Sequence, residues 1–510
     1  MQPIATDLTG NAQLPPDHLP AASDVFAGLP PTRSDGPRLR ESIRAMRAAD
    51  GVLIGVLDDD PTGSQAVHDV QVVTAGDEDV YAAALAGPAA TCFVLTNTRS
   101  LAEPAAAALT GRVTHGLIAA ASRNAAAGRS SRIQLVSRSD STLRGHLMAE
   151  VRALHAVRRE VTGAGFDGVL LVPAFIEAGR LTAADIHWAR TGSGLVPVGE
   201  TEFARDAAFG YTASDLKAFI SEKSGGGISA AEVHSISLAD IRYGGPERIR
   251  DQLSVLADGA WVVVNATEYS DLETVACAVL LAERGGKAFG FRTGPSFVRA
   301  LAGLEPRPPL RGGELLAFRP GSGRNGLIVA GSHVAQTGRQ LAVLRERRGI
   351  TSVELDVPAV LGGTRAGEVV AGAARQVADA LNQADVLLYT SRAVAAGRSA
   401  EESLAAGRTI SAALASVVRQ AVSGSAPGAG ARPAWIVAKG GITAHDVAVH
   451  GLGIRRAEVA GQLFPGMISV FRPLDAAPEA VGVPYVVFPG NVGDDQTLAE
   501  VAAIMHGEAR

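Results

Sequence analysis

The stretch Gly51–Gln65, GVLIGVLDDDPTGSQ, is an apolar run that stops at three consecutive aspartates. If 52–57 is a strand, apolar residues fill both of its faces, which predicts a buried strand of a parallel sheet. Asp58, Asp59 and Asp60 would then lie at its carboxyl end, the edge where open α/β sheets bind ligands. Carboxylates there could accept hydrogen bonds from hydroxyl groups, hold Mg²⁺ or act as a general base. A solvated turn is the alternative, because Asp, Pro, Thr and Gly all favour turns.

Two further apolar runs end in polar clusters in the same way. The run 91–98, TCFVLTNT, is followed by Arg99, and 132–136, RIQLV, leads into 137–145, SRSDSTLRG. Because these clusters follow strands, we expect them to share a ligand crevice with the acidic turn. Arg99 would supply a cation that can bind a carboxylate bidentately, although an arginine at a strand end is more often a surface residue. The second cluster could bind a polyhydroxylated acid, cap a helix starting near Leu147, or form a solvated loop.

Strands and helices alternate along most of the chain. This alternation predicts βαβ crossovers and an α/β fold of two domains, each a mostly parallel sheet flanked by helices, with a ligand cleft between them. A chain of 510 residues is also too long for one ordinary core. We expect a tail at 1–38 that could be disordered, a first domain at 39–302, a linker or hinge rich in Pro, Gly and Arg at 303–325, and a second domain at 326–510.

The second domain repeats the strand pattern but ends several strands in glycine-rich turns. Its expected strands are 327–330, 352–357, 386–389, 435–438, 467–471 and 485–488. Three of them end in turns, at 331–333 (GSH), 439–443 (KGGIT) and 489–495 (PGNVGDD). Backbone N–H groups of such turns can approach phosphate oxygens, and Lys439 could offset phosphate charge, although a single Gly-Gly turn is usually only a tight connection. No G-x-x-x-x-G-K-[ST] and no G-x-G-x-x-G follows a strand, so we expect neither a P-loop nor a standard dinucleotide fold.

Composition and charge exclude several other classes of protein. The formal net charge of -5 and the isoelectric point near 6.2 give no basic surplus, so nucleic acid or an anionic membrane is not an expected partner. Cys92 and Cys277 are the only cysteines, which predicts neither a disulfide framework nor a cysteine metal site. No run is long enough for a membrane span and no signal pattern opens the chain, so we expect a cytoplasmic protein.

Six short motifs, taken together and in order, resemble the four-carbon acid sugar kinase family. They are DDDPTG at 58–63, DSTLRG at 140–145, PAFIEAGR at 173–180, GS at 331–332, GGIT at 440–443 and GNVGD at 490–494. The resemblance implies a sugar-acid domain followed by an ATP domain of a non-P-loop kind. It implies phosphorylation of the terminal hydroxyl of threonate, erythronate or 3-oxo-tetronate, with ATP and Mg²⁺ as cofactors. A small sugar acid and ATP are then the partners, with no nucleic acid and no membrane, and a homodimer is left open.

Matching by motif and by place at strand ends gives candidate residues for each role. The candidate catalytic residues are Asp59 and Asp60, and no metal ligand is assigned. The candidate substrate-binding residues are Asp59, Thr62, Arg99, Arg138, Asp140, Ser141, Thr142 and Arg144. The candidate nucleotide-binding residues are Ser332, Lys439, Gly440, Gly441, Ile442, Thr443, Gly490, Asn491 and Gly493. Arg138 and Ile442 stand where many relatives have Lys and Glu, so the substrate or the nucleotide contacts could differ.

Two other classes of function compete with a kinase. One is a sensor that binds a sugar acid or a nucleotide without turnover. The other is a different cytoplasmic α/β enzyme, such as a dehydrogenase or an aldolase-like lyase, against which the missing dinucleotide fingerprint argues.

Overall fold

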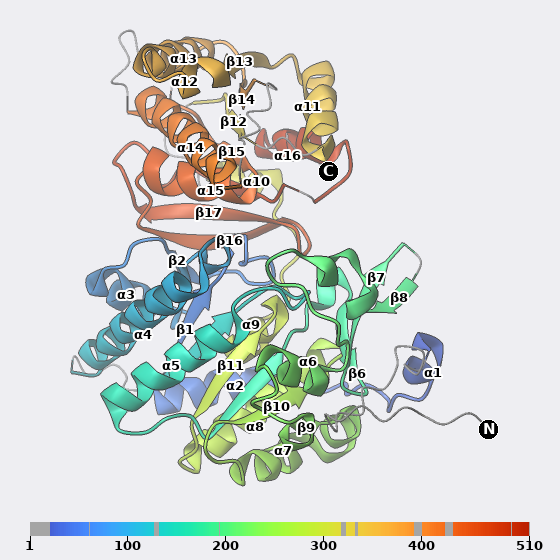
Figure 1. The fold of residues 1–510 in the computed structure, drawn as a ribbon. Helices are drawn as coiled ribbons and strands as arrows, with labels where there is room; N and C mark the ends of the chain where they lie inside the picture. The colour runs from blue at the N-terminus through green and yellow to red at the C-terminus, as the bar shows by residue number, and fades with distance from the viewer. Residues whose placement is uncertain are drawn as a thin grey trace.

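The computed structural model describes residues 21–60, 62–126, 132–192, 194–317, 323–331, 335–391, 400–423, 432–490 and 492–508, with the backbone alone for 400–405. The chain forms an N-terminal and a C-terminal lobe, and the strands β16 (Arg456–Phe464) and β17 (Ile468–Asp475) lie where the two lobes meet (Figure 1).

Within the described residues, one sheet of 15 strands runs through both lobes. Its order is β13-β14-β12-β15-β18-β17-β16-β2-β3-β1-β4-β11-β5-β10-β9. The N-terminal lobe contributes β1 (Val52–Asp58), β2 (Gln71–Val73), β3 (Thr91–Leu95), β4 (Arg132–Arg138), β5 (Gly168–Val172), β9 (His234–Ile236), β10 (Ala260–Val264) and β11 (Phe289–Thr293). The C-terminal lobe contributes β12 (Leu327–Ala330), β13 (Thr351–Leu355), β14 (Val386–Thr390), β15 (Ile436–Lys439) and β18 (Tyr485–Phe488), besides β16 and β17.

The strands β16 and β17 reverse the direction of the sheet between the lobes. Neighbouring strands from β2 to β9 are all parallel, and so are those from β13 to β18. The pairs β18–β17, β17–β16 and β16–β2 are antiparallel. The parallel strands of the two lobes therefore run in opposite directions along the sheet.

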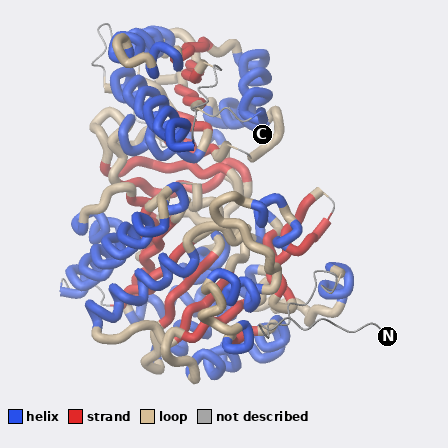
Figure 2. Tube along the Cα trace, in the orientation of Figure 1, coloured by secondary structure: helices blue, strands red, loops and turns tan. Residues whose placement is uncertain are grey.

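Helices cover both faces of the sheet, as expected for an α/β fold (Figure 2). In the N-terminal lobe, one face carries α2 (Gly36–Asp50), α7 (Gly245–Ser254), α8 (Tyr269–Arg284) and α9 (Pro295–Ala302), and the other carries α3 (Glu78–Leu85), α4 (Glu103–Ala126), α5 (Leu147–Thr162) and α6 (Leu216–Lys223). In the C-terminal lobe, α12 (Val357–Leu361), α13 (Ala366–Ala380), α14 (Ala400–Val422) and α15 (Gly441–Asp446) lie on one face, and α10 (Gly312–Ala317), α11 (Ala335–Arg348) and α16 (Thr497–Met505) on the other. Every residue of β1 is buried, which explains its unbroken apolar sequence.

A small antiparallel sheet, absent from the sequence-based prediction, flanks the N-terminal lobe. It consists of β6 (Arg180–Ala183), β7 (Ile186–Thr191) and β8 (Gly194–Pro197). The short helix α1 (Ala22–Ala27) lies against it, and the ring of Phe26 meets that of Trp188 edge-on at 5.9 Å. The described part of the expected tail is thus attached to the first lobe.

Backbone hydrogen bonds join the two lobes across β2 and β16. Asp69 N donates to Val459 O at 2.7 Å, and Val459 N donates to Val70 O at 2.9 Å. The segment expected to be a linker also contacts the C-terminal lobe, because Leu310 is buried and its N donates to Gln462 O at 2.8 Å. Each lobe has its own mostly parallel strands and helices, as expected, but the lobes share one sheet.

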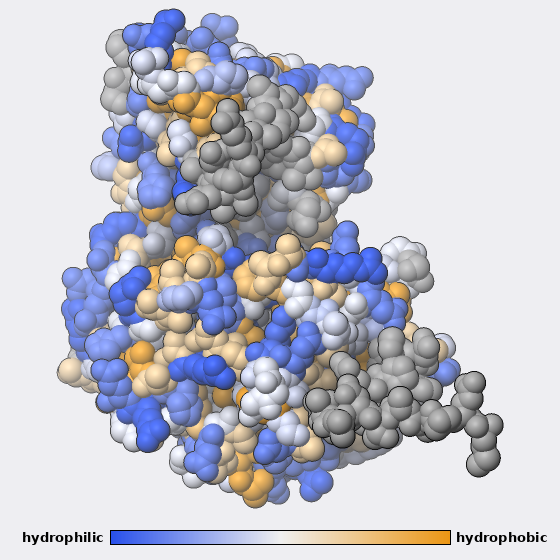
Figure 3. All heavy atoms as spheres, in the orientation of Figure 1, coloured by the Kyte–Doolittle hydropathy of each residue, from blue (hydrophilic) through white to orange (hydrophobic). Residues whose placement is uncertain are grey.

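Several strand boundaries differ from the expected ones. The strand predicted at 352–357 spans 351–355, and that predicted at 467–471 continues to Asp475. The strand β16 was not predicted. Figure 3 shows hydrophilic and hydrophobic residues interspersed over the face in view, with a waist between the lobes. None of the described helices combines the length and the hydropathy that a membrane crossing requires.

Candidate functional site

The three aspartates lie at the carboxyl end of β1, as the sequence predicts, and Arg99 joins two of them. Arg99 Nη2 donates to Asp59 Oδ1 at 2.6 Å, and Arg99 Nη1 donates to Asp60 Oδ2 at 3.1 Å. Burial alone would lower the pKa of Arg99, but the two carboxylates raise it well above its usual value. Arg99 is therefore a cation already balanced by the acidic turn.

Asp58 points away from the crevice and binds Arg138 beneath the turn. Arg138 Nη1 donates to Asp58 Oδ1 at 2.7 Å, and both side chains are buried. A methyl group at position 63 would lie 2.1 Å from Asp58 Oδ2, so only glycine fits over this ion pair. Burial raises the pKa of Asp58 to about 7. We expected Arg138 to meet a substrate carboxylate, whereas in this structure its guanidinium holds Asp58.

Asp60 closes the turn through Thr62. Its Oδ1 accepts hydrogen bonds from Thr62 N at 2.8 Å and Thr62 Oγ1 at 2.7 Å. Burial favours the neutral form, but Arg99, Arg138 and the bonds from Thr62 outweigh it and lower the pKa of Asp60. The hydrogen bonds of Asp60 are therefore those of a carboxylate that stabilises a turn.

Asp59 has a different environment, because a second buried network lies beside it. Glu150 accepts hydrogen bonds from Ser137 Oγ at 2.9 Å and Thr98 Oγ1 at 2.5 Å, and it also pairs with Arg292. Burial and the negative charge of Glu150 raise the pKa of Asp59, against the opposing effect of Arg99. The pKa of Asp59 is thus raised, and its Oδ2 has only a long, 3.4 Å contact with Arg99 Nε.

Gly145 lies between Asp59 and Arg292. A methyl group at this position would lie 2.9 Å from both Asp59 Oδ2 and Arg292 Nη2, and the backbone φ of +117° also favours glycine. Arg292 and Glu150 were not among the predicted site residues. Arg292 lies at the carboxyl end of β11, so the rule that found Arg99, polar residues at the end of a buried strand, could have found it.

The cluster after β4 forms its own ion pair. Arg144 Nε donates to Asp140 Oδ2 at 2.6 Å, and Thr142 Oγ1 also bonds Asp140. Burial would raise the pKa of Asp140, but Arg99 and Arg144 lower it to about 2. The Ser141 carbonyl oxygen lies 2.8 Å from His187 Nε2, and the Thr142 carbonyl accepts from Tyr211 Oη at 2.7 Å. His187 of the small sheet and Tyr211 beyond it therefore fix this loop.

Three turns of the C-terminal lobe lie together at one sheet edge. β12, β15 and β18 are neighbouring parallel strands, and Ala330, Lys439 and Phe488 are in register at their carboxyl ends. The expected nucleotide-binding turns that follow these residues are consequently adjacent. Ser332 and Asn491 lie outside the described residues.

Lys439 is directed into one of these turns. Its Nζ donates to the carbonyl oxygens of Pro489 at 2.8 Å and Gly490 at 3.0 Å, and it lies 4.0 Å from the centroid of the Phe488 ring. The residue is fully buried, and burial lowers its pKa to about 7. We expected Lys439 to offset phosphate charge, whereas here it holds the Pro489–Gly490 turn.

The remaining glycine-turn residues show close packing and one exposed side chain. A methyl group at Gly331 would lie 2.7 Å from Thr443 Oγ1, and one at Gly493 would lie 2.6 Å from Thr497 Oγ1. Gly440 has φ of +109° and precedes α15, which begins at Gly441. Ile442 is 62% exposed, which is unusual for a large apolar side chain and leaves it accessible to a ligand.

The acidic turn and the glycine turns approach each other across the two lobes. A methyl group at Gly441 would lie 4.0 Å from Thr62 Cγ2. Nearby, Ser64 Oγ donates to Ser469 Oγ at 3.2 Å. A hollow between the lobes is lined by Gln65 and His68 from one lobe and by Gln462 and Gly466 from the other, among others. Thr62 and Gly441, one from each predicted set of site residues, are thus neighbours in space.

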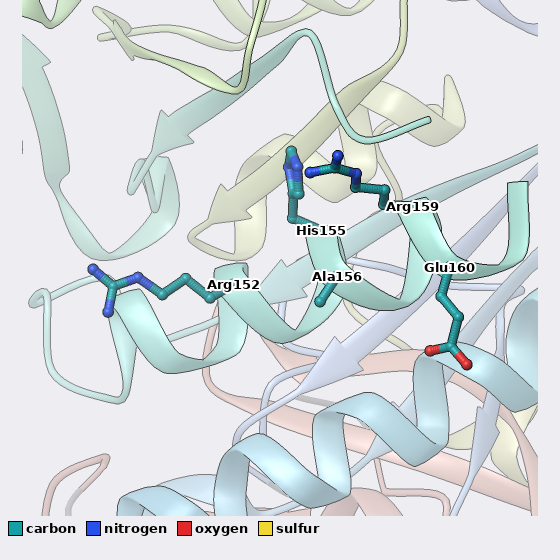
Figure 4. Close-up of a pocket in the computed structure, with 5 residues that line it drawn as sticks. All are labelled: Arg152, His155, Ala156, Arg159 and Glu160. Atoms are coloured by element: carbon teal, nitrogen blue, oxygen red, sulfur yellow. The ribbon is translucent and has the colours of Figure 1, made fainter. Parts of the chain in front are cut away.

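A separate surface hollow lies along α5, where Arg152, His155 and Arg159 line it (Figure 4). His155 Nδ1 accepts from Phe166 N at 3.4 Å, just before β5 begins, so this hollow lies toward the amino ends of the strands. It is distant from the strand ends that carry the site. Among the described residues, no three His, Cys, Asp or Glu side chains gather as metal ligands would.

These features define a two-lobed α/β protein with a cluster of charged side chains at the strand ends of one lobe and glycine turns in the other. A family model described as a sugar-binding N-terminal domain matches residues 54–301, and one described as a nucleotide-binding C-terminal domain matches 327–498. The chain therefore combines a sugar-binding N-terminal domain with a nucleotide-binding C-terminal domain, as these two family models describe them.

Two solved structures show the same fold at low sequence identity, and a third matches with a low TM-score. Haemophilus influenzae protein HI1011 matches with a TM-score of 0.60 and 15% identity, over 89% of this chain and 100% of its own. A protein of Salmonella typhimurium LT2 matches with a TM-score of 0.62 and 17% identity, over 88% and 98%. A DUF1537 domain of Bordetella bronchiseptica, described as a domain-swapped dimer with bound citrate, covers 90% of this chain and 99% of its own at 20% identity, with a TM-score of 0.35. A search of curated proteins gives no match.

Proposed function

We propose that this protein transfers the γ-phosphoryl group of ATP to the terminal hydroxyl of a four-carbon sugar acid of the threonate, erythronate or 3-oxo-tetronate type. The observation that carries the proposal is the proximity of Gly441, at the start of α15, to Thr62 in the acidic turn, where a methyl group on Gly441 would lie 4.0 Å from Thr62 Cγ2. A phosphate bound at the glycine turns would lie beside a carboxylate that can orient a hydroxyl group. Phosphoryl transfer depends mainly on such positioning and on charge neutralisation.

Asp59 is the proposed general base. Burial and the charge of Glu150 raise its pKa, and its Oδ2 faces the space over Gly145. Asp60 has its oxygens bonded to Thr62 and Arg99, and Asp58 is buried against Arg138. The proposed role of Asp60 is to hold the turn and Arg99 in place.

The proposed nucleotide site comprises the three turns of the C-terminal lobe. Gly441 has open space around it within the described residues, apart from Thr62, so its backbone can approach a phosphate. Ile442 offers exposed apolar surface at the turn that begins α15. Mg²⁺ is usually held by one or two carboxylates together with substrate phosphates, and it would neutralise charge on the phosphates of ATP.

An ADP-release assay with Mg²⁺-ATP and a panel of four-carbon sugar acids tests the proposal. We expect turnover with at least one acid, and we expect Asp59→Asn to lower kcat by about 100-fold or more, as removal of a general base does. ATP binding, measured by calorimetry, should be largely retained in this variant. Absence of ADP release with every acid would reject the proposed substrate class, and full activity of Asp59→Asn would reject Asp59 as the base.

A further inference from the structure

The arginines first expected to bind the substrate carboxylate already have acidic partners. Arg99 binds Asp59 and Asp60, Arg138 binds Asp58, and Arg144 binds Asp140 at 2.6 Å. A substrate carboxylate would compete with a neighbouring aspartate for the charge of each of them, even at Arg138, whose Nε has no hydrogen-bond partner. A cation with only neutral partners would bind the incoming charge at lower cost.

Arg180 is such a cation at the same edge of the sheet. It begins β6, a few residues beyond the carboxyl end of β5, and it is half-buried. Its Nη1 donates to the carbonyl oxygens of Ala178 at 3.2 Å and Arg190 at 3.1 Å. Burial lowers the pKa of Arg180, with only partial compensation from Asp140. The guanidinium is thus fixed in place by neutral oxygens, and its charge is not matched by a bonded carboxylate.

The edge of the guanidinium formed by Nε and Nη2 is available. Arg180 Nε is buried without a hydrogen-bond partner, and Nη2 makes no hydrogen bond to the described residues. Two other arginines of this protein use the same edge to bind a carboxylate. Arg33 does so with Asp35, at 2.9 and 2.5 Å, and Arg242 does so with Asp271, at 2.8 and 2.8 Å.

Arg180 also lies beside the loop that carries the predicted substrate residues. Arg144 and Arg180 approach the ring of Phe203, with their Cζ atoms 5.1 and 5.6 Å from its centroid. Both arginines therefore contact the same ring. Arg144, which is bonded to Asp140, comes from the loop after β4, and Arg180 comes from the start of β6. Phe203 keeps the two guanidinium groups in defined positions.

We propose that the Nε–Nη2 edge of Arg180 binds the carboxylate of the sugar acid and so determines the preference of the site for acids. This inference rests on the proposed function. The hydroxyl group to be phosphorylated would face Asp59, and the acid end of the substrate would face Arg180, with Phe203 and Arg144 lining the space beside it. Arg180 is the last residue of the motif PAFIEAGR, and its proposed role follows from its hydrogen-bond partners.

The test compares a four-carbon sugar acid with its carboxamide, which has the same shape and no charge. The ratio of kcat/KM for acid over amide is measured for the wild-type chain, Arg180→Gln, Arg180→Lys and the control Arg205→Gln, an exposed arginine in the same loop as Phe203. Because the ratio compares two substrates of one preparation, partial unfolding of a variant does not affect it.

We expect Arg180→Gln to reduce the acid-over-amide ratio by about 10- to 100-fold, as for loss of a charge-assisted hydrogen-bond pair. The loss should appear mainly in KM for the acid. Arg180→Lys should recover part of the ratio through its charge, and Arg205→Gln should retain the wild-type ratio. An unchanged ratio in Arg180→Gln, or an equal loss in Arg205→Gln, would overturn the proposed role of Arg180. Neither outcome would contradict the proposed kinase activity. If the wild-type chain neither binds nor phosphorylates any four-carbon acid, the proposed function itself fails.

Discussion

Three consecutive aspartates differ in their electrostatics because each has different partners. Arg138 binds Asp58 in the interior, Arg99 and the Glu150 network surround Asp59, and Thr62 saturates one oxygen of Asp60. Burial raises the pKa of Asp58 and Asp59, whereas hydrogen bonds and two arginines lower that of Asp60. The chemistry of the turn therefore depends on residues far away in the sequence.

At this scale we predict that Glu150→Gln shifts the acid limb of the pH profile of kcat/KM to lower pH. The base must be deprotonated, so activity falls as pH drops through the pKa of Asp59, which lies above the usual range of about 3.9. Removing the charge of Glu150 removes a cause of that raised pKa and leaves Arg292 unpaired beside Asp59.

Glu160→Gln is the matched control, because Glu160 lies on the same helix α5 but is exposed. Its pH profile should equal that of the wild-type chain. An acid limb that stays in place or moves upward in Glu150→Gln would contradict the assignment of Asp59 as the titrating base.

Which residues lie near the site could be predicted from the sequence, but their pairing could not. Asp59, Arg99 and Asp140 each follow an apolar run, and parallel strands bring such positions to one edge. Whether Arg138 meets a ligand or Asp58 depends on which way the side chain leaves the end of β4, and sequence periodicity does not specify this. The available edge of Arg180 likewise depends on two carbonyl oxygens, those of Ala178 and Arg190.

At the scale of elements, the turns after β15 and β18 form one unit held by Lys439. The lysine has no acidic partner among the described residues, and its Nζ satisfies two carbonyl oxygens of the Pro489–Gly490 turn. A buried amine whose pKa is lowered to about 7 is easily neutralised near neutral pH. Lys439 consequently acts on the nucleotide site by positioning a turn.

We predict that Lys439→Met lowers the free energy of unfolding by about 1–3 kcal/mol, the usual effect of unsatisfied buried acceptors. It should also raise KM for ATP more than it lowers kcat. Because the folded-state pKa lies below the unfolded value, the unfolded chain binds more protons between about pH 7 and about pH 10.4. The wild-type chain should therefore gain stability relative to Lys439→Met as pH rises through this window.

Urea unfolding at several pH values measures both quantities. Lys287→Met serves as the control, since Lys287 has a carboxylate partner, Asp167, at 3.3 Å. It should show no comparable gain with pH. A stability difference between wild type and Lys439→Met that is independent of pH would show that the lysine remains fully charged in the folded protein.

Elements with a clear period could be predicted, and those with a broken or short pattern could not. The buried strands β1 and β12 consist almost wholly of apolar residues, so the sequence indicates them directly. In β16, buried positions alternate at 457 and 459, but register shifts around Gly461 interrupt the alternation. The strands β6 to β8 are short and carry polar residues, and their pairing depends on contacts with the first lobe.

At the scale of the whole molecule, the shared sheet makes the two lobes interdependent. The strand β16 has β17 on one side and β2, from the other lobe, on the other. A sheet that lost β2 would present an unpaired edge in which Val459 N and O have no partner. Closure of the lobes would bend this ladder as well as the 303–325 segment.

We predict that residues 303–510 expressed alone associate into dimers or larger species through the edge of β16. Size-exclusion chromatography with light scattering measures the mass. Co-expression of residues 1–302 should restore a one-to-one complex, because β2 then covers the edge. A monomeric 303–510 fragment with the melting temperature of the full chain would contradict this interdependence.

The two halves of the site lie at the carboxyl ends of β1 and β15. Because strand direction reverses between the lobes, the number of strands between β1 and β15 affects whether these ends can meet. In a flat sheet, the carboxyl ends of β1 and β15 would lie on opposite edges, because three antiparallel pairings separate them. Six pairings connect these strands, and a twist of roughly 20–25° at each rotates one against the other by roughly 120–150°. That rotation largely cancels the reversal and brings Gly441 to Thr62. The number of central strands therefore sets the rotation of one lobe against the other. Adding or deleting a pair of strands would leave both lobes folded, but it would turn the two halves of the site away from each other.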